Sequence, residues 1–148
     1  MKRALPAVLV LLMTAMTAVA GTPDAEDAAI IAVVDQAYVH GVHIDNDPAL
    51  MRAGMHDSFV MFVQSDKGIT QLTRDAWIER LAASKAAQDP NAKKPEIKAD
   101  ITVLDRSGKA AVAKVALFRD GKQIFTDYIS LYRFDDGWKL VAKIFNRH

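Results

Sequence analysis

The chain has 148 residues, of which 51% are hydrophobic and 25% are charged, and its formal net charge at pH 7 is +1. This length suits one domain with one core. The balanced charge, with no concentrated basic stretch, argues against a nucleic-acid-binding surface, and a sequence without cysteine can form no disulfide.

The N-terminal segment has the layout of a secretory signal peptide. Lys2 and Arg3 supply a charged start, an apolar stretch follows, and Ala18-Val19-Ala20 matches a small-x-small cleavage site. The apolar stretch is too short for a comfortable membrane span. We therefore predict a periplasmic or secreted protein with no stable membrane anchor after cleavage. The predicted segments are a signal peptide over 1–20 and one domain over 21–148.

Two helices are predicted before the first strand. Thr22-Pro23-Asp24 offers a cap and a proline suited to the first helical position, and apolar residues then recur at helical spacing to about His43. Asp47-Pro48 begins a second, short helix, which Gly54 ends.

The middle of the chain predicts two strands and a third helix. Residues 58–64 are rich in Phe and Val, and a turn after them leads to a brief strand over 69–72. Thr73 then caps a helix whose apolar side carries Trp77, Ile78 and Leu81. The segment 89–95, with two prolines and two lysines, predicts an exposed connector.

The last third of the chain predicts four consecutive strands joined by glycine-containing turns, over 97–104, 110–118, 123–134 and 138–146. A two-residue turn at Asp120-Gly121 would place Lys114 opposite Asp127, with Asp127 diagonal to Lys143. A three-residue loop at 119–121 would instead move Asp127 and Lys143 to the apolar face.

The two-residue turn separates the sheet into a charged and an apolar face. The charged face would carry Lys98, Asp100, Lys114, Asp127, Arg133, Lys139 and Lys143. The apolar face would pack against the helices and carry Ile97, Ile101, Val103, Val115, Leu117, Tyr128, Tyr132, Trp138, Leu140 and Ile144.

The element order α-α-β-β-α-β-β-β-β indicates an α+β domain with helices on one sheet face. Several segments carry a family resemblance, namely Val34-Asp35-Gln36-Ala37-Tyr38 with Gly41, His56 with Phe59, Trp77, the stretch 127–131 and the stretch 137–143. On these residues the chain resembles the nuclear transport factor 2-like superfamily and, within it, the putative lumazine-binding family. The resemblance covers essentially all of 21–148.

The resemblance implies a cystatin-like fold, in which a cone-shaped, curved and mostly antiparallel sheet packs against three N-terminal helices. It relates the chain to ketosteroid isomerase and polyketide cyclases, and it implies a pocket and a homodimer formed through the sheet. The family name suggests a flavin-like ligand.

Two sets of polar residues are candidates for chemistry. His40 and His43 lie three apart and could hold a metal with His56 or Asp57, but no metal-binding signature accompanies them. Imidazoles also suit a helix C-terminus, so we predict no metal and no cofactor.

By fold-level analogy, Tyr38, Asp127 and either His56 or Asp57 take positions like those of the ketosteroid isomerase acid–base groups. The preferred register argues against that role, because it places Asp127 in an exposed ion pair.

The candidate ligand-binding residues are aromatic: Tyr38, Phe62, Trp77, Tyr128, Tyr132 and Trp138. They predict either a packed core or the walls of a pocket with a few polar handles. Three functions follow from these patterns: a module that binds a small aromatic or apolar ligand, an isomerase-like or cyclase-like enzyme using the same cone, and a dimeric interaction domain with a filled core. A buried acid beside a tyrosine would favour the enzyme, and a cavity-free interior would favour the interaction domain.

Overall fold

The computed structural model describes residues 24–148, so the predicted signal peptide and the predicted cap Thr22 lie outside the described residues. The first helix, α1 (Ala25–Val34), begins after Asp24, whose carboxylate accepts hydrogen bonds from the backbone N–H groups of Glu26 and Asp27. The chain continues directly into a π-helix, η1 (Asp35–Ile44), and then into α2 (Pro48–Gly54), which Asp47 caps as predicted.

The remaining elements follow the predicted order. β1 (Met55–Ser65) and β2 (Gly68–Thr73) form a hairpin, and α3 (Arg74–Ala86) begins at the predicted cap Thr73. A connector over 87–96 leads to the meander, which consists of β3 (Ile97–Ser107), β4 (Ala110–Arg119), β5 (Lys122–Phe134) and β6 (Gly137–Arg147). The predicted α+β class and the predicted element order are confirmed. None of the helices between 24 and 148 is both long enough and apolar enough to span a bilayer.

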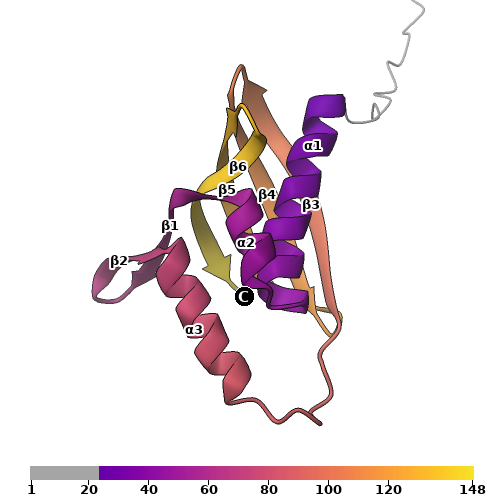
Figure 1. Ribbon diagram of the computed structural model, residues 1–148, viewed down its shortest axis with the longest axis vertical. Coiled ribbons are helices and arrows are strands. Elements are labelled where there is room, and N and C mark those ends of the chain that lie inside the picture. Colours follow the sequence, from indigo (N-terminus) through magenta and orange to yellow (C-terminus); the bar gives the residue numbers. More distant parts are fainter. Residues whose placement is uncertain (1–23) are drawn as a thin grey trace, which may run out of the picture.

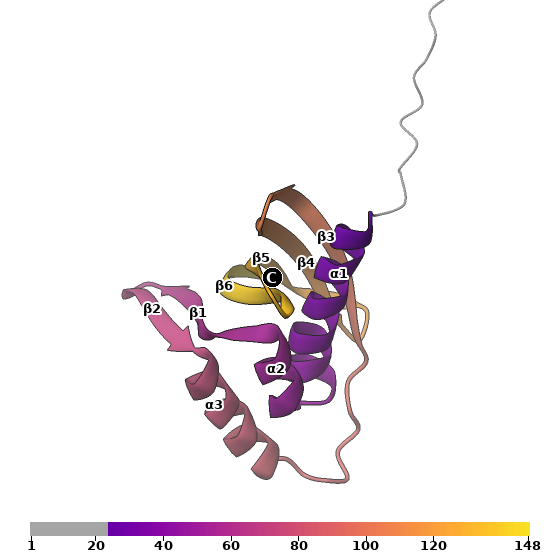
Figure 2. The same ribbon diagram turned by 45° about the horizontal axis from the view of Figure 1, so that its top comes forward.

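The six strands form one curved sheet in the order β2-β1-β6-β5-β4-β3. All neighbours are antiparallel except β1 and β6, which run parallel. The helices lie on one side of the sheet, with α1 alongside β3 (Figures 1 and 2). The helix α3 projects away from the meander, and the connector returns from its far end to β3 (Figure 1).

The register of the meander is interrupted by β-bulges, and the one after the Asp120-Gly121 turn changes the predicted faces of β5. The Asp120-Gly121 turn has two residues as predicted, and Arg119 pairs with Lys122. Beyond it Phe118 pairs with Gln123 but Leu117 pairs with Phe125, so Ile124 is an extra residue on β5. Such an insertion turns every later side chain of the strand to the opposite face.

Asp127 therefore lies opposite Val115 on the helix-facing side, and the predicted pair of Lys114 with Asp127 is wrong. Lys114 lies opposite Tyr128 instead. The predicted diagonal relation between Asp127 and Lys143 is confirmed, but on the buried face rather than on the charged one.

The core fills the space between the helices and the inner sheet face. Its largest fully buried side chains include Tyr38, Phe59, Ile30, Met51, Met55, Leu117, Ile129, Leu131 and Leu140. Tyr128, Tyr132 and Ile144 were predicted to join this core but lie on the outer face, with exposed fractions of 40%, 53% and 55%.

Candidate ligand cavity

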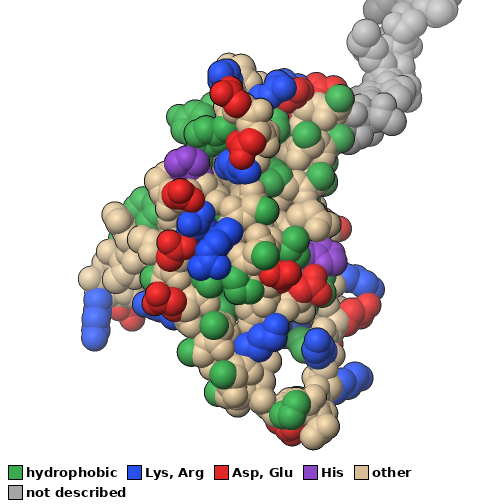
Figure 3. Space-filling model, viewed as in Figure 1, with side chains coloured by type: hydrophobic (Ala, Val, Ile, Leu, Met, Phe, Trp, Pro, Cys, Tyr) green, Lys and Arg blue, Asp and Glu red, His purple; other side chains and the backbone are tan. Residues whose placement is uncertain are grey.

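A cavity of about 650 Å³ lies between η1, α3, the connector and the end of the meander. Its apolar walls come from Tyr38, Val42, Ile44, Met61, Trp77, Leu81, Ile97, Phe125 and Phe145. Polar side chains from η1, α3, the connector and the ends of β4 and β6 complete the lining. In Figure 3 the molecule is hollowed between α3 and the connector, and Lys and Arg side chains gather beside the hollow.

The helix η1 places three side chains in the cavity wall. Because a π-helix closes hydrogen bonds from i to i+5, residues four or five apart share a face. Tyr38, Val42 and His43 meet that spacing, and all three line the cavity. The loop after η1 adds Asp45 and Asn46 to the lining.

A buried polar cluster of Tyr38, Asp127 and Lys143 lies beside the cavity. The Tyr38 hydroxyl donates a hydrogen bond of 2.8 Å to Asp127 Oδ2, and the Lys143 ammonium forms an ion pair with Asp127 Oδ1. Lys143 Nζ also lies 3.4 Å from the Tyr38 hydroxyl oxygen. The exposed fractions are 1% for Tyr38, 0% for Asp127 and 4% for Lys143, so each polar group depends on the others for partners.

The protonation states within this cluster follow from its burial. Desolvation, together with the charge and hydrogen bond of Asp127, raises the pKa of the Tyr38 hydroxyl well above its ordinary value. Desolvation lowers the pKa of Lys143, while the Asp127 carboxylate acts in the opposite direction. Tyr38 therefore stays protonated at neutral pH, and its hydroxyl proton is donated in the hydrogen bond to Asp127.

The Lys143 ammonium is also surrounded by aromatic rings. Its nitrogen lies 4.3 Å from the ring centroid of Phe145 and 5.0 Å from that of Tyr38. Trp77 and Phe125 lie at 6.0 Å and 5.9 Å. These contacts add cation–π attraction to the ion pair and form the aromatic inner end of the cavity.

His43, which lines the cavity, has a buried ring nitrogen, Nε2, that makes no hydrogen bond within the described residues. Desolvation, with the nearby positive charges of Lys143 and Arg119, lowers the pKa of His43 from 6.5 to about 3. The imidazole is therefore neutral at physiological pH and can both donate and accept a hydrogen bond.

The structure brings two of the six predicted ligand-binding residues, Tyr38 and Trp77, into the cavity wall. Trp138 is buried on the helix-facing side as predicted, but its indole donates to Glu26 Oε2 on α1, away from the cavity lining. Phe62 is half-buried on β1 and lies outside the lining. Tyr128 and Tyr132, placed on the inner face by sequence, project from the outer face because of the bulge.

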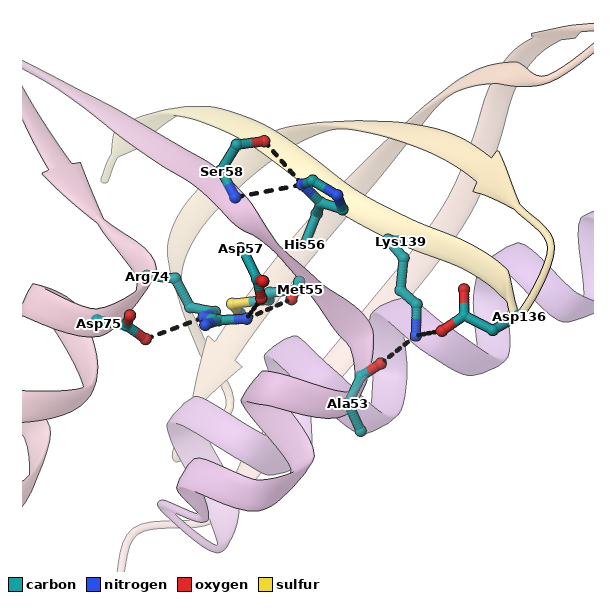
Figure 4. A network of polar contacts seen from close by, with 9 residues as sticks. All are labelled: Ala53, Met55, His56, Asp57, Ser58, Arg74, Asp75, Asp136 and Lys139. Atoms are coloured by element: carbon teal, nitrogen blue, oxygen red, sulfur yellow. Dashed lines mark hydrogen bonds and ion pairs between the residues drawn. The ribbon is translucent and has the colours of Figure 1, made fainter.

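The other predicted polar residues have structural partners elsewhere. Figure 4 shows Asp57 held by Arg74, which also contacts Asp75 and the Met55 carbonyl. His56 Nδ1 lies 2.7 Å from Ser58 Oγ, and its ring stacks on Phe134.

The two candidate metal ligands on η1 also differ from each other. His40 pairs with Asp45 at 2.8 Å, whereas His43 lines the cavity. No group of three or more candidate metal ligands occurs within residues 24–148.

Sequence reasoning missed the cavity residues that the meander supplies. Phe125, Lys143 and Phe145 were not predicted as site residues. Phe125 follows the bulge at Ile124, and the two residues of β6 follow a second bulge at Val141. Arg119 and Arg147 were also missed, since a basic residue at a strand end looks like ordinary surface charge. The dense alternation of lysines with aromatic residues near the C-terminus was the available signal.

Comparison with known proteins gives a family and a fold. A family model described as Putative lumazine-binding matches residues 25–146. No curated protein matches the chain.

Several solved structures share the architecture. A nuclear transport factor 2-like protein of unknown function from Shewanella baltica OS155 is 23% identical with a TM-score of 0.64, covering 86% of this chain and 98% of that one. A putative aromatic ring hydroxylase from Novosphingobium aromaticivorans is 19% identical with a TM-score of 0.61, covering 86% and 92%. A cystatin-like domain from Nostoc punctiforme PCC 73102 is 14% identical with a TM-score of 0.60, covering 86% and 80%. At these identities the likeness concerns the fold alone.

Proposed function

Because the chain belongs to the putative lumazine-binding family, we propose that it binds a small, partly aromatic molecule in the cavity between η1, α3 and the meander. The observation that carries this proposal is the cavity itself, whose volume of about 650 Å³ falls within the range of small-molecule sites. Its aromatic inner end and its few polar groups match the usual make-up of such sites. A flavin-like or pterin-like ring is the first ligand class to test, since the family description names lumazine.

One observation favours the second candidate function, an acid–base enzyme of the isomerase or cyclase kind. Asp127 is a buried acid hydrogen-bonded to Tyr38, which is the arrangement such chemistry would use. Its carboxylate is already paired with Lys143, however, and it lies outside the cavity lining. A general base works best with a pKa near the operating pH, and the pKa of His43 is about 3. These protonation states support binding over catalysis.

The binding proposal is tested by native mass spectrometry of protein purified from its own host, together with a thermal-shift screen of flavins, pterins and steroids. We expect one class to be retained or to raise the melting temperature. The variant Ser84→Trp places a bulky ring at the cavity lining and should abolish that shift. Ala83→Trp, its neighbour outside the lining, should not. If no class is retained or stabilises the protein, or if both variants keep the shift, the proposal fails.

The same preparation separates binding from catalysis. Histidine resonances followed by NMR would report the pKa of His43 with and without ligand. A pKa that stays well below neutrality in the complex agrees with a binding role, whereas a pKa raised to about 6–7 would support the acid–base enzyme.

We also propose that the protein is exported and cleaved after Ala20. The charged, apolar and small-residue regions of 1–20 support this proposal. N-terminal sequencing of protein from the periplasm or medium should begin at Gly21, and recovery of the full chain from membranes would contradict it.

A homodimer formed through the outer sheet face is the remaining proposal. Large apolar side chains are exposed on that face, as a buried contact with a second copy would require: Val112, Tyr128, Tyr132 and Ile144. The cavity on the opposite face weakens the alternative of an interaction domain with a filled core.

A further inference from the structure

The cavity has two chemically different ends. At the inner end, Tyr38, Trp77 and Phe145 present their rings around the Lys143 ammonium. At the mouth the lining comes from Arg119, Arg147 and the connector residue Lys94. A ligand that fills the cavity therefore meets flat apolar surface at one end and positive charge at the other.

The positive charge at the mouth is not neutralised by the protein. Within residues 24–148, Arg119, Arg147 and Lys94 form no ion pair. Asp45, the one carboxylate among the lining residues, pairs with His40 at 2.8 Å. Lys143 is paired with Asp127 deeper inside, so its charge is already compensated.

The two arginines are placed by the sheet at one end of the cavity. Arg119 ends β4 and lies opposite Lys122 of β5, whereas Arg147 ends β6 and lies opposite Phe125 of the same strand. The Arg147 guanidinium lies 5.3 Å from the Phe125 ring centroid, which orients it over the aromatic wall. Guanidinium groups hold carboxylates through paired hydrogen bonds, which makes arginine a better carboxylate ligand than lysine.

A separate observation points to a ligand between the two ends. The buried His43 Nε2 has no partner in the described chain, and an unsatisfied buried polar atom costs stability. His43 lines the same cavity and lies edge-on to Tyr38, with ring centroids 4.9 Å apart. A polar group of a bound molecule would satisfy this atom.

Resting on the proposed binding function, we propose that the ligand is an aromatic carboxylate. Its planar ring packs against Tyr38, Trp77 and Phe145, and its carboxylate is held at the mouth by Arg119 and Arg147. His43 forms a hydrogen bond with a polar substituent of the ring. The protein is thus selective for a monoanionic, flat molecule over a neutral one of the same shape.

Calorimetry with two matched probes tests this selectivity. 2-Naphthoate carries the ring and the anion, and 2-naphthamide carries the same ring without charge. We expect the wild type to bind 2-naphthoate at least tenfold more tightly at 50 mM salt, with the advantage shrinking at 500 mM because the contacts are charged. The double variant Arg119→Gln/Arg147→Gln should lose that advantage while keeping its affinity for the amide.

Arg80 is the matched control, since it is an exposed arginine on α3 outside the cavity lining, and Arg80→Gln should behave as the wild type does. Equal binding of the two probes, or an advantage that persists in the double variant, overturns the aromatic carboxylate while leaving the binding function intact. Absence of binding by either probe also overturns this inference. The binding function itself then fails only if the ligand screen and native mass spectrometry are negative too.

Discussion

At the scale of single residues, Asp127 connects stability with the cavity. Its two carboxylate oxygens hold Tyr38 and Lys143, and both of those residues line the cavity. Removing two charges from water is costly, and the cost is recovered only when both partners remain. The cluster therefore acts as a unit that fixes one wall of the cavity.

A first prediction concerns this pair. Asp127→Ala leaves the Lys143 ammonium buried without its carboxylate and should cost about 3–5 kcal/mol of unfolding free energy. The double variant Asp127→Leu/Lys143→Met removes both charges and should recover much of that loss. Denaturant melts measure both. A single variant that unfolds like the wild type would contradict the burial of the pair, and Arg80→Gln, at an exposed position on α3, is the neutral control.

A second prediction uses the lowered pKa of His43. The folded protein keeps this imidazole neutral down to about pH 3, whereas the unfolded chain protonates it near 6.5. Between those values the unfolded state binds more protons, so the stabilisation present above pH 6.5 is lost as the pH falls.

Urea melts at pH 7 and pH 4.5 should show the wild type losing about 2 kcal/mol more than His43→Leu, which cannot titrate. Parallel losses in the two proteins would mean that His43 is accessible to protons in the folded state.

At the scale of elements, the bulge at Ile124 decides which residues of β5 face the cavity. Before Ile124, the alternation of side chains along β5 follows the pairing set by the Asp120-Gly121 turn. After Ile124 the alternation is reversed, so side chains that would have faced outward face the helices. If Ile124 were paired with β4 instead of bulged, Asp127 would face outward and Tyr128 would face the helices. One apolar residue therefore decides which side chains of β5 lie on each face of the sheet.

A third prediction follows from this role. Deleting Ile124 leaves Phe125 directly after Gln123, so all later pairings with β4 are preserved without a bulge. We expect the deletion variant to fold, with some loss of packing, and to keep the Tyr38–Asp127 hydrogen bond. Deleting Thr126 instead leaves the bulge intact and turns Asp127 outward, so this variant should be far less stable. Circular dichroism melts compare the two, and equal stability would argue against the bulge as the determinant.

The elements were predictable from sequence because their signals are local. Thr73 and Asp47 cap helices through the nearest backbone N–H groups, and glycine marks the turns of the meander. The bulge was not predictable, because Ile124 resembles its neighbours and nothing local distinguishes an inserted residue from a paired one. That omission misplaced Asp127, Tyr128 and Tyr132. A second bulge, at Val141 on β6, was also missed, and it places Lys143 on the same face as Trp138 and Leu140.

Only part of the cavity lining was predicted from the sequence. Tyr38 and Trp77 were recognised from aromatic content and helical position. The open space depends on how far α3 projects from the sheet, which is a long-range arrangement with no local signature. For the same reason, the sequence did not predict that Lys94, Arg119 and Arg147, which come from three distant segments, lie together at the mouth of the cavity.

At the scale of the whole molecule, the two faces of the sheet differ in what they contact. The inner face supplies core and cavity, while the outer face exposes tyrosines and an isoleucine that the core does not use. Their exposure is costly in water unless another surface covers them.

A fourth prediction tests the dimer proposed for the outer face. We expect the wild type to sediment as a dimer at micromolar concentration, and Tyr128→Glu/Ile144→Glu to sediment as a monomer, because charges would be buried against their own copies. Ile69→Glu changes an exposed isoleucine on β2 and should leave the dimer intact. A monomeric wild type would refute the proposal.

The single parallel pairing in the sheet has a consequence for the order of folding. Neighbouring strands from β3 to β6 are joined by tight turns, so their contacts close short loops and can form early. The pairing of β1 with β6, for instance Met55 with Leu140, joins segments that are far apart in the sequence and requires a much larger loop to close. We therefore expect substitutions that weaken this junction to speed unfolding while leaving the refolding rate nearly unchanged. The cavity, whose walls come from both sides of that junction, would be completed in the last step of folding.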